Sequence, residues 1–131
     1  MRFLLDTSVL LWSRAGEHKL NSRAKELLSS RSSELFLSAA SVWEIAIKYV
    51  LGALRLHAPP GLYIPGVLSE MDIHALDVTL MHAIEAGGLP PHHRDPFDRM
   101  LIAQANAEQL VLLTADRIFE KYNVEQVFCG K

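Results

Sequence analysis

The chain has 131 residues, of which 50% are hydrophobic and 21% are charged. This length suits one domain spanning residues 1–131, and the hydrophobic fraction excludes a disordered chain. One cysteine excludes an internal disulfide framework, and the net charge of −2 gives no indication of a nucleic-acid partner. Since no apolar run approaches the ~20 residues of a membrane span and Asp6 interrupts any signal-peptide core, we expect a cytoplasmic protein without a membrane partner.

Strand-like and helical segments alternate along the chain. In chain order they are a strand at 2–5, helices at 7–14 and 22–30, a strand at 34–38, helices at 42–51 and 62–71, a strand at 73–76, helices at 80–86 and 96–109, a strand at 110–114, a short helix at 118–122 and a last strand at 126–128. This alternation predicts an α/β fold, a doubly wound central parallel sheet of four or five strands flanked by helices.

Acidic residues recur next to the predicted strand ends. Asp6 follows the first strand, Glu44 lies in the first turn of a helix that follows a strand, and Asp116 follows the strand at 110–114. Asp98 opens the helix that leads into that same strand. Because ligands of doubly wound sheets bind at the carboxyl ends of strands, we expect these four acids to meet at one edge.

Each acid also has an ordinary structural interpretation. Asp6 and Asp116 are placed to cap the helices that follow them. Glu44 has capping-box spacing from Ser41 and helix ion-pair spacing from Lys48, although the remaining positions of its helix are apolar, which indicates a buried helix with one polar stripe.

Asp98 gives the sharper indication of a site. It shares one side of its predicted helix with Leu101, Ile102 and Ala105, whereas Asp95 is the better candidate for the cap. A carboxylate on an apolar side is costly unless a cation or hydrogen bonds stabilise it.

Clustered carboxylates repel one another unless a cation binds between them. Oxygen ligands of this kind suit Mg²⁺, for which Mn²⁺ can substitute, and two-metal phosphodiester hydrolysis uses such a site.

Other residues are candidates for supporting roles at this site. Hydroxyls that are candidates to support the acids, or only to cap helices, are Thr7, Ser8 and Thr114. Candidate RNA phosphate contacts, or simply solvated charges, are Lys48, Arg94, Arg99 and Arg117. His92 and His93 are candidates to bind a transition metal, but they share a proline-rich loop, where adjacent histidines are usually solvated, so we expect them to be solvated.

Four sequence blocks resemble the PIN domain, and more narrowly the VapC toxins of bacterial toxin–antitoxin pairs. They are the segments 3–8 (FLLDTS), 41–48 (SVWEIAIK), 94–105 (RDPFDRMLIAQA) and 113–116 (LTAD). The resemblance implies that Asp6, Glu44, Asp98 and Asp116 form the acidic catalytic and metal-binding quartet, with Asp6 and Asp98 as direct ligands. It also implies an Mg²⁺-dependent endoribonuclease with an RNA substrate, a homodimer, a small cognate antitoxin that blocks the cleft, and a central strand order of 3-2-1-4.

Two other functions compete with this interpretation. A receiver or phosphatase-like domain requires an acid such as Asp77 and a lysine after a later strand, and no suitable lysine follows residues 110–114. A non-catalytic RNA- or protein-binding PIN module would be favoured by loss of a quartet acid, and none is lost.

The helix at 62–71 offers a candidate surface for the homodimer. Its apolar residues are Leu62, Tyr63, Ile64, Val67 and Leu68. They predict either part of a symmetric interface or a helix that packs on the chain's own core.

Overall fold

The computed structural model describes residues 1–131 and contains one sheet of five parallel strands in the order β3-β2-β1-β4-β5. The strands are β1 (Arg2–Leu5), β2 (Glu34–Ser38), β3 (Ile73–Leu76), β4 (Val111–Thr114) and β5 (Gln126–Phe128). The chain builds outward from β1 to β3 and then returns to place β4 on the other side of β1. The predicted α/β class and the central order 3-2-1-4 are therefore confirmed, and the strand order reverses between β1 and β4.

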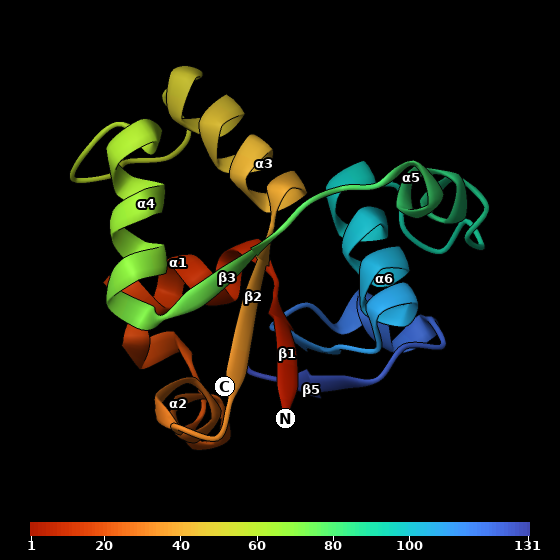
Figure 1. Cartoon of the computed structure of the whole chain (residues 1–131), viewed down its shortest axis with the longest axis horizontal. Coiled ribbons are helices and arrows are strands. Elements are labelled where there is room, and N and C mark those ends of the chain that lie inside the picture. The colour runs from red at the N-terminus through yellow and green to blue at the C-terminus, as the bar shows by residue number, and fades with distance from the viewer.

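Helices cover both faces of this sheet. They are α1 (Thr7–Ala15), α2 (Ser22–Ser29), α3 (Ala39–Val50), α4 (Pro60–Met71), α5 (Leu80–Gly87) and α6 (Pro96–Glu108), with short 3₁₀ helices η1 (Glu17–Lys19) and η2 (Arg117–Lys121). Figure 1 shows α1, α2 and α4 on one side of the sheet, and α5 and α6 on the other. None of the helices combines the length and the apolar character needed to span a bilayer.

Because side chains along each strand alternate between the two faces of the sheet, the apolar core consists of two clusters. Phe3 and Leu5 of β1 belong to the larger apolar cluster, which also contains residues of α1, α2, α3 and α4. Leu4 points to the opposite face and joins Leu101 and Ile102 of α6. Each of these side chains is at most 2% exposed, so the central strand is buried on both faces, as expected for a parallel sheet.

Helix α3 begins three residues before the predicted start. The Ser38 hydroxyl accepts a hydrogen bond from the Ala40 N–H at 3.0 Å, so the last residue of β2 is itself the cap. The predicted capping box is therefore wrong, because Ser41 lies inside the helix. The prediction of a buried helix is also wrong, since Trp43 and Val50 are 64% and 82% exposed.

Helix α4 does not offer the predicted dimer surface. Tyr63, Ile64 and Val67 are buried in the larger core cluster, and Leu62 is the exposed member of the set. The buried residues of this helix therefore pack against the chain's own core, which was the second of the two predicted alternatives.

Candidate metal centre

Asp6 lies where the strand order reverses. One carboxylate oxygen accepts the N–H of Val9 at 2.8 Å and caps α1, as its position after β1 predicted. The other oxygen accepts the N–H of Ala115 at 3.3 Å, just beyond the end of β4. Asp6 is therefore a helix cap that also connects the ends of two adjacent strands.

The environment of Asp6 disfavours its negative charge. Its side chain is buried, and this burial raises the pKa of Asp6 above its ordinary value. Hydrogen bonds from Thr114, Val9 and Ala115 lower the pKa, whereas the nearby charge of Asp116 raises it further. A bound cation would stabilise the ionised form.

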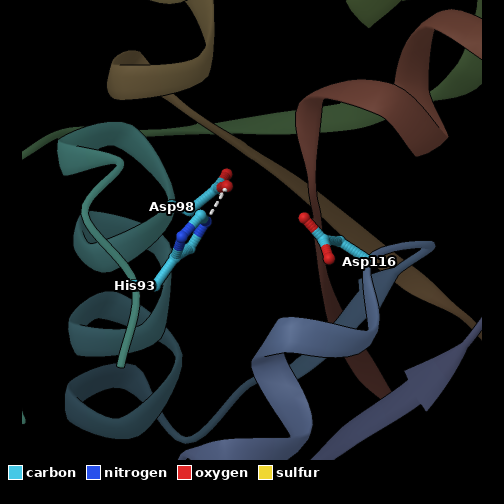
Figure 2. A group of neighbouring side chains, drawn as sticks. All are labelled: His93, Asp98 and Asp116. Carbon is cyan, nitrogen blue, oxygen red and sulfur yellow. Dashed lines mark hydrogen bonds and ion pairs between the residues drawn. The ribbon is translucent and has the colours of Figure 1, made fainter. Parts of the chain in front are cut away.

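The most compact group of ligating side chains consists of His93, Asp98 and Asp116. Each offers one ligand atom, and these atoms lie within 4.8 Å of one another. His93 Nε2 is 2.7 Å from an oxygen of Asp98, and Figure 2 shows Asp116 facing this pair from the segment between β4 and η2. The structure therefore brings together two of the four predicted acids with a histidine.

Asp98 lies in the first turn of α6, which Asp95 caps by accepting the N–H groups of Phe97 and Asp98. Burial raises the pKa of Asp98 to about 6; the hydrogen bond with His93 lowers it, and the charges of Asp95 and Asp6 raise it. The charges of Asp98 and Asp6 therefore interact. Together with Asp116, whose charge also acts on Asp6, these residues form the acidic cluster.

Glu44 lies outside the compact group. One of its oxygens accepts the Thr7 hydroxyl at 2.6 Å and the other accepts the Lys48 ammonium at 2.7 Å. The hydrogen bond to Glu44 raises the pKa of Lys48, and the charges of Asp95 and Asp98 add to this effect. The polar stripe of α3 therefore faces the acidic cluster, with its carboxylate already paired.

The predicted supporting hydroxyls divide into two kinds. Thr7 holds Glu44, and Thr114 contributes to the environment of Asp6 and accepts the N–H of Asp116 at 3.1 Å. Ser8 is exposed and forms no hydrogen bond with any of the acids, because it lies on the outer side of α1. The supporting role predicted for Ser8 is wrong.

The four predicted phosphate contacts differ in their exposure and in the partners of their side chains. Arg94 is exposed without a side-chain partner, Lys48 is half-exposed, and Arg117 pairs with Glu120 while its guanidinium lies 3.5 Å from the centre of the Phe128 ring. Arg99 instead donates to backbone carbonyls of the loop at 86–93. These hydrogen bonds occupy both terminal nitrogens of the guanidinium and hold the loop, so the structure supports a structural role, and a phosphate contact by Arg99 stays a prediction.

The expectation that His93 is simply solvated is also wrong. The ring is only 20% exposed and packs edge-on against Phe119. The sequence did hold one signal for this contact, the position of His93 five residues before Asp98 and two before the helix cap Asp95. A loop that enters a capped helix at this point can fold back over the first turn of the helix.

The charge balance of the site fits a divalent cation. No lysine or arginine forms an ion pair with Asp6, Asp98 or Asp116. Burial disfavours the ionised forms of Asp6 and Asp98, and oxygen donors are the ligands that Mg²⁺ and Mn²⁺ prefer. Asp116 is held by its own bond to the Ile118 N–H at 3.0 Å, so it is a cap for η2 as well as a member of the cluster.

The solved structures most relevant here are toxin–antitoxin proteins. VapBC2 from Rickettsia felis, bound to a DNA fragment from its promoter, has a TM-score of 0.71 at 15% identity, covering 99% of this chain and 100% of the other. DNA-bound VapBC from Salmonella typhimurium has a TM-score of 0.65 at 23% identity, covering 98% of each chain. VapC20 from Mycobacterium tuberculosis, a Sarcin-Ricin loop cleaving toxin, has a TM-score of 0.66 at 15% identity, covering 96% of this chain and 98% of the other.

These identities show a shared fold, and a search of curated proteins finds no significant match. A family model for the PIN domain matches residues 3–125, which include β2, β3, β4, all of β1 except Arg2, and all of the acids described above, whereas β5 lies beyond the match. The chain therefore belongs to the PIN domain family.

Proposed function

We propose that this PIN domain is a metal-dependent endoribonuclease, the toxin of a toxin–antitoxin pair, which uses Mg²⁺ or, in its place, Mn²⁺. The observation that carries the proposal is the juxtaposition of Asp6, Asp98 and Asp116 beside the β1–β4 junction without a cationic side chain to neutralise them. The likeness to VapC20, a toxin that cleaves the Sarcin-Ricin loop, supports RNA as the substrate class. The intact acidic set disfavours a non-catalytic module.

In this proposal Asp6, Asp98 and Asp116 hold the ion. When bound, Mg²⁺ activates a water molecule and offsets charge on the phosphodiester. The N–H groups of Val9 and Ala115 fix Asp6, which limits the reorganisation needed when the ion binds. Glu44 adds a carboxylate that is held by Thr7, and the half-exposed Lys48 beside it provides a cation for the RNA backbone.

The products of cleavage test this proposal. Water activated at an acidic metal site leaves a 5′-phosphate and a 3′-hydroxyl, without participation of the ribose 2′-oxygen. We expect purified protein with Mg²⁺ to give RNA fragments that a 5′-phosphate-dependent exonuclease degrades, and we expect EDTA to stop cleavage. Fragments ending in 2′,3′-cyclic phosphate, formed equally well in EDTA, would contradict the proposal.

A small antitoxin is the proposed protein partner, since the similar VapBC structures are toxin–antitoxin complexes. A groove between α1 and the α3–α4 connection combines an apolar floor with basic residues. It is lined by Leu11, Trp12, Arg14, Ala15, Lys19, Leu54, Arg55, Leu56, His57 and Tyr63. A segment with apolar and acidic side chains would complement this groove.

We also propose a homodimer, with its interface on α5 and the adjoining end of α3. Both elements carry exposed apolar side chains, and Trp43 of α3 and Val78, two residues before α5, line one hollow of about 480 Å³. In α5, Leu80, Met81 and Ile84 are 79%, 58% and 59% exposed. An apolar patch of this kind on a soluble domain favours association.

Replacing Met81 and Ile84 together by glutamate is expected to prevent this dimer, because it places charges in an apolar contact. Sedimentation at micromolar concentration should change from twice the chain mass to the chain mass of 14.6 kDa. Leu62→Glu is the matched control, since Leu62 is 70% exposed on α4. A parent protein that sediments only as the monomer would exclude the dimer.

A further inference from the structure

His93 is held in place by an extensive network within its loop. The Tyr122 hydroxyl accepts the His93 N–H at 2.8 Å and donates to the Pro90 carbonyl at 2.7 Å. The Arg99 guanidinium donates to the carbonyls of Ala86, Leu89, Pro90 and His93. Two side chains from other parts of the chain therefore fix a loop rich in glycine and proline and hold the His93 backbone beside α6.

The ring of His93 is directed at the acidic cluster as a result. It packs edge-on against Phe119, with ring centroids 6.1 Å apart, and its Nε2 lies 2.7 Å from Asp98. Both side chains remain about one-fifth exposed, so an ion from solvent can reach them. Figure 2 shows the ring and the two carboxylates around a common space.

The separation of the two ligand atoms suits one octahedral ion. Ligands about 2.1 Å from an ion and at right angles to one another are about 3 Å apart, close to the observed 2.7 Å between His93 Nε2 and Asp98. An ion bound by both atoms would replace the proton that the pair now shares, but it would lie to one side of the line that joins them, about 2.1 Å from each. A ligand atom of Asp116 lies within 4.8 Å of both atoms.

We propose that His93 is itself a metal ligand, which makes this a mixed nitrogen–oxygen site. The inference rests on the proposed function only in placing an ion among Asp98 and Asp116. An imidazole nitrogen strengthens binding of first-row transition ions such as Co²⁺ and Zn²⁺ much more than binding of Mg²⁺, which prefers oxygen. His93 therefore raises the selectivity of the site for transition ions.

Metal binding without RNA tests this assignment. Co²⁺ is titrated into the dialysed protein and followed by its visible absorption, and Mg²⁺ affinity is measured by competition against Co²⁺. We expect His93→Ala to weaken Co²⁺ binding about 100-fold and Mg²⁺ binding less than about threefold, because only the nitrogen ligand is lost. His92→Ala is the matched control, since His92 is the adjacent residue but packs its ring against Tyr122.

His93→Gln separates ligation from positioning. Its side-chain amide can still donate to Asp98 but provides no imidazole nitrogen, so we expect the loss of Co²⁺ affinity to persist. Zn²⁺ should also shift the ¹⁵N resonance of Nε2 of His93 in the parent protein. Recovery of Co²⁺ affinity in His93→Gln, or equal losses for Co²⁺ and Mg²⁺ in His93→Ala, would overturn the assignment and leave His93 as a positioning residue.

Melting in EDTA verifies that the variants are folded before any titration. Different results would contradict the inference and the proposed function. A protein that binds Co²⁺ through His93 but cleaves no RNA overturns the function alone, whereas Mg²⁺-dependent cleavage with an unaltered Co²⁺ affinity in His93→Ala overturns the inference alone.

Discussion

Asn at position 6 or 98 is expected to reduce the rate of RNA cleavage about 100-fold or more, while the protein stays folded. The amide is neutral and binds Mg²⁺ poorly, so each substitution removes one of the charges that hold the ion. Asn remains a good helix cap, and its side-chain oxygen can still accept the N–H of Val9 that Asp6 accepts at 2.8 Å. Cleavage of a defined RNA under single-turnover conditions measures the effect.

Asp77→Asn is the matched control for these two variants. Asp77 is an exposed acid in the loop before α5, and its side chain has no hydrogen-bond partner. We expect this variant to cleave RNA at the parent rate. Parent-like cleavage by Asp6→Asn and Asp98→Asn would instead leave Asp6 as a helix cap and Asp98 as a first-turn acid of α6, and would remove the basis of the proposed nuclease.

The fold was predictable because its determinants are local. Each strand is a short apolar run, and α6 is marked by Asp95 as cap, Pro96 at the first helical position and apolar residues at helical spacing. The start of α3 was not predictable in this way. Ser38 belongs to β2 and also caps α3, so there is no intervening loop whose composition would mark the boundary.

The acids of the site were predictable from the strand-end rule, but their partners were not. Asp6 and Asp116 each cap a helix with one carboxylate oxygen and also lie close enough for their charges to interact. The sequence offered these roles as alternatives, and the structure combines them. Glu44 is different, since it caps no helix and a cationic side chain, Lys48, pairs with its carboxylate.

Arg99 and His93 show what a single sequence conceals. The acceptors of Arg99 lie 6 to 13 residues earlier in the chain, and Tyr122 contacts the same loop from 29 to 32 residues away. No periodicity connects these positions, because the contacts arise only when η2 and α6 pack together. A cation that stabilises a loop and one that binds phosphate therefore look alike in the sequence.

In metal-free protein, Asp98→Asn is expected to increase the free energy of unfolding at about pH 8. The pKa of Asp98 is raised from 3.8 to about 6, so the stability contributed by its protonated form is complete below about pH 4 and is lost as the pH rises through 6. The neutral amide avoids that loss. With one-fifth of the side chain exposed to screening water, the gain should be about 1–3 kcal/mol.

Urea unfolding of parent and variant in EDTA, across about pH 4 to 8, measures this difference. The two proteins should be most different at the alkaline end and nearly equal at the acidic end, while Asp77→Asn stays close to the parent throughout. If Asp98 served only to stabilise the positive end of α6, the asparagine variant would be the less stable protein at about pH 8.

A saturating divalent ion should reverse the order of the two proteins. An ion that binds only the folded state adds about 4.1 kcal/mol to its stability when present at about 1,000 times its dissociation constant, which exceeds the advantage of about 1–3 kcal/mol expected for the metal-free variant. The parent gains this stabilisation, and the variant gains much less because it has lost a ligand charge. A variant that stays more stable than the parent in saturating Mn²⁺ would show that Asp98 does not hold the ion, because only a bound ion stabilises the ionised carboxylate enough to outweigh the cost of burying it.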